Sequence, residues 1–166
     1  MMNAREYKQT MENWGNAPGF KWDICATWHV PNDIKQRRMD WDDRCQEVEM
    51  RKYFNTVDRH IFKAAHKNRG ERVWRWVVME KAGGVGWHSH ALLKTPEHLS
   101  QQAFIDTLCG LWYKHCGIKS GHRFQSHLFK AELVDGDFLG YTVKGTKFTE
   151  DAKGVFDQHN TFLPKL

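Results

Sequence analysis

The chain has 166 residues, of which 40% are hydrophobic and 27% charged, and its formal net charge is +5 with a pI near 9.0. These values predict one soluble globular domain and exclude a disordered chain. No run of residues is apolar and long enough for a secretory leader or a membrane span, so we expect a protein that is neither secreted nor membrane-bound. The mild positive charge is compatible with a phosphate-rich partner. The four cysteines form no C-x-x-C pair and match no zinc spacing, which predicts free thiols in a reducing compartment.

The first half of the chain predicts an arm, a strand and a long helix. Residues 1–19 are polar and end in turn-forming residues, which predicts an N-terminal arm. Residues 20–30 are rich in aromatic and β-branched residues and predict the first strand. Residues 40–69 have apolar side chains at helical spacing, which predicts a helix with Asp40 as its N-cap and Gly70 as its stop.

A β-hairpin is predicted next. Residues 73–81 and 87–94 have strand composition, and the Gly-rich segment 82–86 between them favours a turn. Because side chains alternate along a strand, His88 and His90 should share one face, and the hairpin should bring Glu80 beside them. A register shifted by one residue would instead make Glu80 a surface carboxylate.

These three side chains predict a metal site. Two imidazoles and one carboxylate at one point suit a divalent cation such as Mn²⁺ or Mg²⁺, with coordination positions left open for substrate oxygens. We therefore predict Glu80, His88 and His90 as metal ligands.

The second half predicts a helix that begins after Ser100 and ends near Gly117, a fourth strand over residues 125–134, and a short helix over 138–144. A basic, glycine-containing loop precedes the fourth strand and is the first candidate for contacts to a nucleic-acid backbone, although a solvated surface loop is nearly as good a reading. Its candidate residues are Lys119, His122 and Arg123. Residues 146–166 are polar and less patterned, which predicts a C-terminal tail that is flexible or packs back over the site.

The segment Glu-Lys-Ala-Gly-Gly-Val-Gly-Trp-His-Ser-His-Ala-Leu-Leu resembles the HUH endonucleases, and most closely their replication-initiator (Rep) branch. Tyr-x-x-Lys at Tyr141 and Lys144 is similar to the third motif of that branch. The strand around Thr27 and His29 is loosely similar to its first motif and makes both residues candidates for DNA contact, although strand packing is the simpler explanation for each.

The resemblance implies an activity. Tyr141 would be the nucleophile that attacks a single-stranded DNA phosphodiester, Lys144 would stabilise negative charge or lower the phenol pKa, and the products would be a 5′-phosphotyrosine and a free 3′-OH. The enzyme would nick and join DNA at an origin hairpin or nick site and so initiate rolling-circle replication of a plasmid, phage or virus. The free 3′-OH would serve a host polymerase, and a host helicase would be a further partner, in a prokaryotic cytoplasm or a host nucleus.

The predicted element order favours an α+β fold with helices on a central antiparallel sheet. The resemblance covers about residues 20–145 and implies a sheet of about five strands with ferredoxin-like or RRM-like order. It covers a nuclease domain without the helicase domain that many Rep proteins carry. The alternatives are a small single-tyrosine HUH transposase, which usually carries Gln on its tyrosine helix, a non-catalytic RRM-like nucleic-acid-binding module, and a His-x-His phosphohydrolase. Relaxases fit less well, because their tyrosine precedes the histidine pair.

Overall fold

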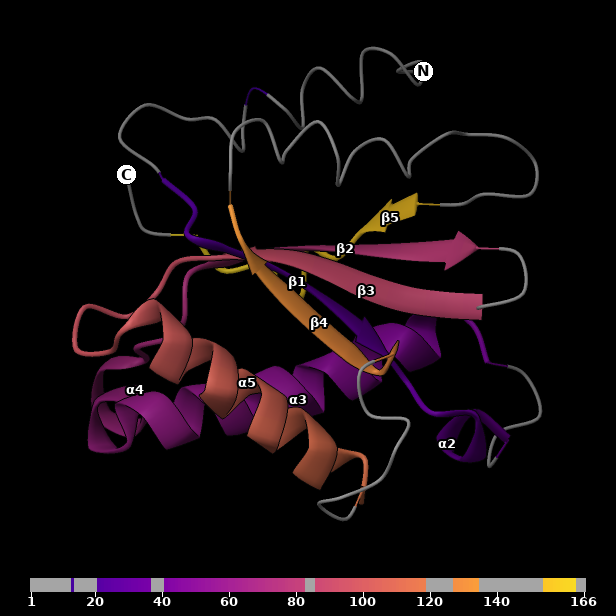
Figure 1. Ribbon diagram of the computed structural model, residues 1–166, viewed down its shortest axis with the longest axis horizontal. Helices are drawn as coiled ribbons and strands as arrows, with labels where there is room; N and C mark the ends of the chain where they lie inside the picture. The colour runs from indigo at the N-terminus through magenta and orange to yellow at the C-terminus, as the bar shows by residue number, and fades with distance from the viewer. Residues whose placement is uncertain are drawn as a thin grey trace.

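The computed structural model describes Asn13 and residues 21–36, 41–82, 86–118, 127–134 and 154–163. It is an α+β structure in which α3, α4 and α5 lie together on one side of an antiparallel sheet (Figure 1). The predicted fold class is therefore confirmed. The elements in chain order are β1 (Ile24–His29), α2 (Asn32–Gln36), α3 (Asp43–Phe62), α4 (Ala64–Arg69), β2 (Arg75–Ala82), β3 (Gly86–Leu93), α5 (Gln101–His115), β4 (Phe129–Leu133) and β5 (Gly154–Phe156).

The sheet has the strand order β4-β1-β3-β2-β5, and every neighbouring pair is antiparallel. Its first four strands follow the split β-α-β-β-α-β arrangement, with β3 inserted between β1 and β2. The strand that carries both predicted histidine ligands is therefore the middle strand of the sheet and has a hydrogen-bonded neighbour on each side.

The two faces of the sheet differ because side chains alternate along each strand. The face toward the helices is apolar and packs on α3 and α5 to form the main core. The largest buried side chains of this core are Trp28, Tyr53, Phe54, Phe104 and Trp112. The opposite face has a smaller apolar cluster of Cys25, Trp76, Val78 and Leu92. Glu80, His88 and His90 continue this second face along β2 and β3.

The predicted long helix is divided in two. Its N-cap is Asp42, whose carboxylate accepts a hydrogen bond from the Cys45 amide at 2.8 Å, whereas Asp40 lies outside the described residues. The helix is interrupted at Lys63, where φ is +47°, and α4 then runs to the predicted stop at Gly70. Positive φ is uncommon for a residue other than glycine, and no glycine or proline in the sequence marks this break.

Several predicted boundaries were too wide, and two elements were missed. The first strand begins at Ile24 rather than residue 20, and the fourth begins at Phe129 rather than 125. The helix α2 follows β1 where only a turn was expected. The tail expected over 146–166 contains β5, which pairs with β2 and places Gly154 opposite Glu80. A strand of three residues is too short for alternation to reveal, and it forms because the edge of β2 offers unpaired backbone groups.

A buried ion pair holds this C-terminal segment on the sheet. Arg75 and Asp58 are 2% and 0% exposed, and Arg75 Nη1 lies 2.8 Å and 3.0 Å from the two carboxylate oxygens. Arg75 Nε donates to the Asn160 carbonyl at 2.8 Å, and the Asn160 side chain donates to the carbonyl of Glu47 in α3 at 2.9 Å. One guanidinium thus joins α3, β2 and residues 157–163.

A second contact, between Glu49 and His115, joins α3 to α5, and it predicts a pH dependence of stability. His115 Nε2 lies 2.8 Å from Glu49 Oε1, and the hydrogen bond from His115, helped by Lys52, lowers the Glu49 pKa from 4.5 to about 2. A depressed carboxyl pKa stabilises the folded state above the unfolded pKa, and the contribution is lost as the pH falls from about 4.5 toward 2. Glu49→Gln should therefore lower the free energy of unfolding by about 1–2 kcal/mol at pH 7.

Urea unfolding of the wild type and Glu49→Gln over a series of pH values measures this effect. The difference between the two proteins should shrink toward zero as the pH approaches 2. Glu97→Gln, on an exposed residue, is the control and should follow the wild type. A Glu49→Gln difference that does not change with pH would contradict the assignment.

Candidate metal centre

The β2–β3 hairpin brings the three predicted ligands together. Glu80 is paired directly with His88 in the antiparallel register, and His90 is paired with Val78 one step along. This arrangement follows because ligands two residues apart on β3 share a face and the pairing of β2 with β3 places Glu80 opposite His88. The predicted convergence is confirmed, and the one-residue register shift is excluded.

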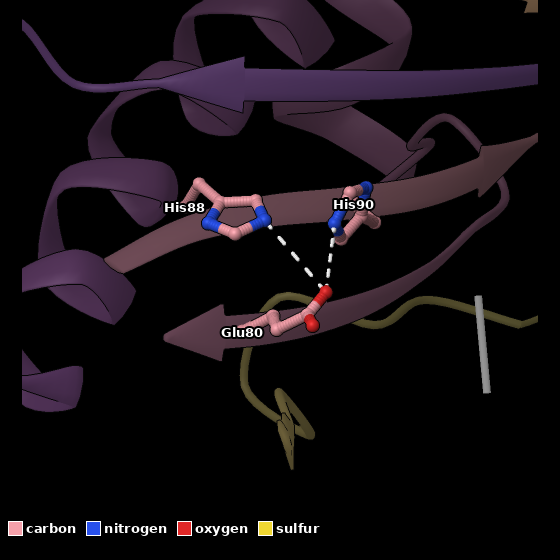
Figure 2. Close-up of side chains that lie close together, drawn as sticks. All are labelled: Glu80, His88 and His90. Atoms are coloured by element: carbon pink, nitrogen blue, oxygen red, sulfur yellow. Dashed lines mark ion pairs between the residues drawn. The ribbon is translucent and has the colours of Figure 1, made fainter. Parts of the chain in front are cut away.

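The three side chains present one ligand atom each to a common point (Figure 2). The ligand atoms all lie within 4.8 Å of one another. Glu80 Oε2 is 3.3 Å from His90 Nε2 and 3.7 Å from His88 Nε2. Two ring nitrogens and a carboxylate oxygen at these separations form a set that suits a divalent cation and leaves its other coordination positions open.

Outer contacts orient both imidazoles. His88 Nδ1 lies 3.1 Å from the Gly86 carbonyl, and His90 Nδ1 lies 2.9 Å from Thr27 Oγ1. A carbonyl only accepts hydrogen bonds, so the proton of a neutral His88 sits on Nδ1 and its Nε2 lone pair faces Glu80. A lone pair and a carboxylate oxygen repel each other, and a cation between them removes the repulsion. Histidine ligands of metal ions commonly make such a hydrogen bond through the ring nitrogen that does not bind the metal.

Burial and neighbouring groups determine the protonation of the ligands and of His29 beside them. Burial lowers the pKa of His88, and the hydrogen bond with His90 is the main cause that lowers the pKa of Glu80. Burial and then the adjacent His88 and His90 lower the pKa of His29 to about 4. At neutral pH Glu80 is therefore anionic and His88 is neutral, so neither of these two ligands has to lose a proton before a metal binds. A metal at His90 Nε2 would replace the proton that this nitrogen shares with Glu80.

Comparison with known proteins adds no family. No protein-family model matches the chain, and no curated protein matches it. Within the part of the chain that the structure describes, no helix combines the length and the apolar character needed to cross a membrane.

The remaining predicted site residues divide into two groups. Thr27 and His29 of β1 both lie against the ligands. Thr27 contacts the His90 ring, and the His29 ring stacks on His88 with centroids 4.9 Å apart and planes at 21°. The rest lie outside the described residues. These are Lys119, His122, Arg123, Tyr141 and Lys144.

Sequence reasoning missed a polar chain on the helix side of β3. Ser89 lies between the two histidines but points the other way, and its Oγ accepts a hydrogen bond of 2.8 Å from the Gln46 side chain. Trp41 Nε1 in turn donates to Gln46 Oε1 at 3.2 Å. Ser89 and Gln46 are both 0% exposed. A serine within a buried strand was the available signal, but its partner lies 43 positions away in the chain.

Sequence reasoning also missed Lys35, which α2 brings to the centre. A Cβ placed on Gly86 would lie 3.5 Å from Lys35 Nζ, and Gly86 is the residue whose carbonyl orients His88. No motif marks Lys35 in the sequence, because its position depends on a short helix that was not predicted.

Proposed function

We propose that the protein is a metal-dependent, site-specific single-stranded DNA endonuclease and ligase of the HUH type. In this proposal it initiates rolling-circle replication of a plasmid, phage or virus by nicking and rejoining DNA. The observation that carries the proposal is the cluster of Glu80, His88 and His90, whose ligand atoms lie within 4.8 Å of one another on the sheet face away from the helices. The resemblance of Tyr141 and Lys144 to the Rep motif supplies the nucleophile.

The mixed donor set favours Mn²⁺ over Mg²⁺ in affinity, because imidazole is a better ligand for Mn²⁺ than for the harder Mg²⁺. The bound ion would polarise the scissile phosphate and stabilise the leaving 3′ oxygen. Glu80 and the two Nε2 atoms would hold it, and Thr27 and Gly86 would keep both rings turned toward it.

The proposed reaction is a transesterification. The Tyr141 oxygen forms a bond to phosphorus as the bond between phosphorus and the 3′ oxygen breaks. The phenol proton is lost to solvent or a nearby base, and the 3′ oxygen gains a proton to give a 3′-OH. Because a phenol titrates near 10, the nucleophile needs the nearby positive charge that Lys144 would provide. The number of phosphate ester bonds is unchanged, so the same site can rejoin DNA.

The test is formation of a covalent protein–DNA adduct. The protein is incubated with Mn²⁺ and a panel of single-stranded and hairpin oligonucleotides and then run on a denaturing gel. The wild type should give an adduct that chelation of the metal prevents, and Tyr141→Phe should abolish it. Tyr113→Phe, which changes a tyrosine on α5, is the matched control and should retain the adduct. An adduct that survives Tyr141→Phe would reject Tyr141 as the nucleophile, and no adduct with any oligonucleotide would count against the proposed reaction.

Two alternatives are less well supported. A non-catalytic RRM-like module stacks bases on exposed aromatic rings of its sheet. Trp76, which lies on this face in β2, is only 1% exposed, and such a module has no use for a cluster of two histidines and a glutamate. The carboxylate ligand Glu80 favours an initiator over a small HUH transposase.

A further inference from the structure

A lysine lies beside the candidate metal centre. The helix α2 follows β1 directly, and it carries Lys35 to the start of β3. The Lys35 ammonium lies next to Gly86, since a Cβ added there would be 3.5 Å from Nζ. Gly86 has φ of +76° and orients His88 through its carbonyl, so this ammonium lies beside the residue that orients one of the three ligands.

The charge of Lys35 acts on the centre. It contributes to the lowered pKa of both His29 and His88, after the larger effects of burial and of the neighbouring imidazoles. Burial also lowers the pKa of Lys35 itself, so the ammonium is partly withdrawn from water. A partly desolvated charge acts more strongly on its neighbours than one on the open surface.

This placement works against metal binding. An ammonium beside Gly86 whose charge acts on His88 also repels a divalent cation bound there, so Lys35 should weaken the affinity for the cation. The same ammonium makes the potential at the centre more positive and so attracts an anionic substrate group. With a divalent ion bound, one carboxylate from Glu80 and neutral histidines, the centre including Lys35 has a net charge of about +2. Such a centre suits a phosphodiester, which has two non-bridging oxygens to share between two cations.

We propose that Lys35 forms a phosphate subsite of the centre, in which its ammonium binds one non-bridging oxygen of the single-stranded DNA phosphodiester whose other non-bridging oxygen faces the metal position. This inference rests on the proposed function for the identity of the substrate. Lys35 thereby positions the phosphate and favours substrate over water at the open coordination positions, at the expense of metal affinity.

The proposal predicts opposite effects on two ligands. Lys35→Met keeps most of the length of the side chain and removes its charge. It should bind Mn²⁺ roughly 3–10-fold more tightly in calorimetry without DNA. In a Tyr141→Phe background with Mn²⁺ present, it should bind a single-stranded oligothymidine of about 20 nucleotides roughly 10-fold more weakly. The slope of log affinity against log salt should fall by about 0.7, as expected for one lost phosphate contact.

Two further variants separate charge from packing. Lys35→Arg keeps the charge and should restore most of the DNA affinity. Lys52→Met removes an exposed lysine of α3 and should match the wild type for both ligands. A Lys35→Met protein that binds Mn²⁺ equally or more weakly, or that binds DNA like the wild type, would overturn the proposal and leave Lys35 with a structural role only. Opposite shifts in a protein that never forms an adduct would support the phosphate subsite and count against the nicking reaction.

Discussion

Replacing Asp58 with Ala is expected to lower the free energy of unfolding by about 3–5 kcal/mol. The reason is the position of Arg75, which is 2% exposed and would keep a buried positive charge without its carboxylate. The Val73 amide, which donates to Asp58 at 2.9 Å, would also lose its acceptor. Urea denaturation at neutral pH measures the change.

A double variant checks the cause. Asp58→Leu combined with Arg75→Met removes both charges and should be considerably more stable than Asp58→Ala, because neither charge is left buried alone. Removing Arg75 also removes its hydrogen bond to the Asn160 carbonyl, so some loss should remain. If Asp58→Ala lowered the free energy of unfolding by less than about 1 kcal/mol, the buried ion pair would not hold the C-terminal segment on the sheet as described.

His90→Ala is expected to weaken Mn²⁺ binding by roughly 100-fold or more and to reduce the covalent adduct in parallel. The substitution removes one of three protein ligands from a cluster with no described replacement close enough to Glu80 and His88. Thr27→Val should have a smaller effect, roughly 10-fold, since it removes only the hydroxyl that orients His90 Nδ1.

Calorimetric titration of each metal-free protein with Mn²⁺ gives the affinities, and circular dichroism checks that the variants remain folded. His60→Ala changes an exposed histidine of α3 and should bind Mn²⁺ as the wild type does. Equal affinities for His90→Ala and the wild type would show that the cluster does not hold a metal. Such a result would also remove the main support for the proposed function.

The hairpin and the helix α5 were predictable because local signals agreed. The glycines of segment 82–86 marked the turn, alternation placed His88 and His90 on one face, and the N-cap Ser100 accepts a hydrogen bond from the Ala103 amide as its position suggested. These features depend on residues that are close in sequence. The alternation of apolar and polar residues then determines which face meets the helices.

The features that escaped prediction depend on distant partners. The strand β5 exists because β2 has an edge to fill, and α2 matters because it brings Lys35 to Gly86. The hydrogen bond between Gln46 and Ser89 joins two positions that nothing in the sequence connects. Tyr141 lies outside the described residues, so its placement relative to the ligands stays a prediction.

The docking of residues 154–163 has a consequence for self-association. Pairing with β5 places β2 inside the sheet, with Glu80 between His88 on one neighbour and Gly154 on the other. Local opening of this segment would expose the backbone groups of β2 as a template for strands of other molecules, the starting point of domain swapping and aggregation. We therefore expect the ion pair between Arg75 and Asp58 to limit aggregation as well as to preserve the geometry around Glu80.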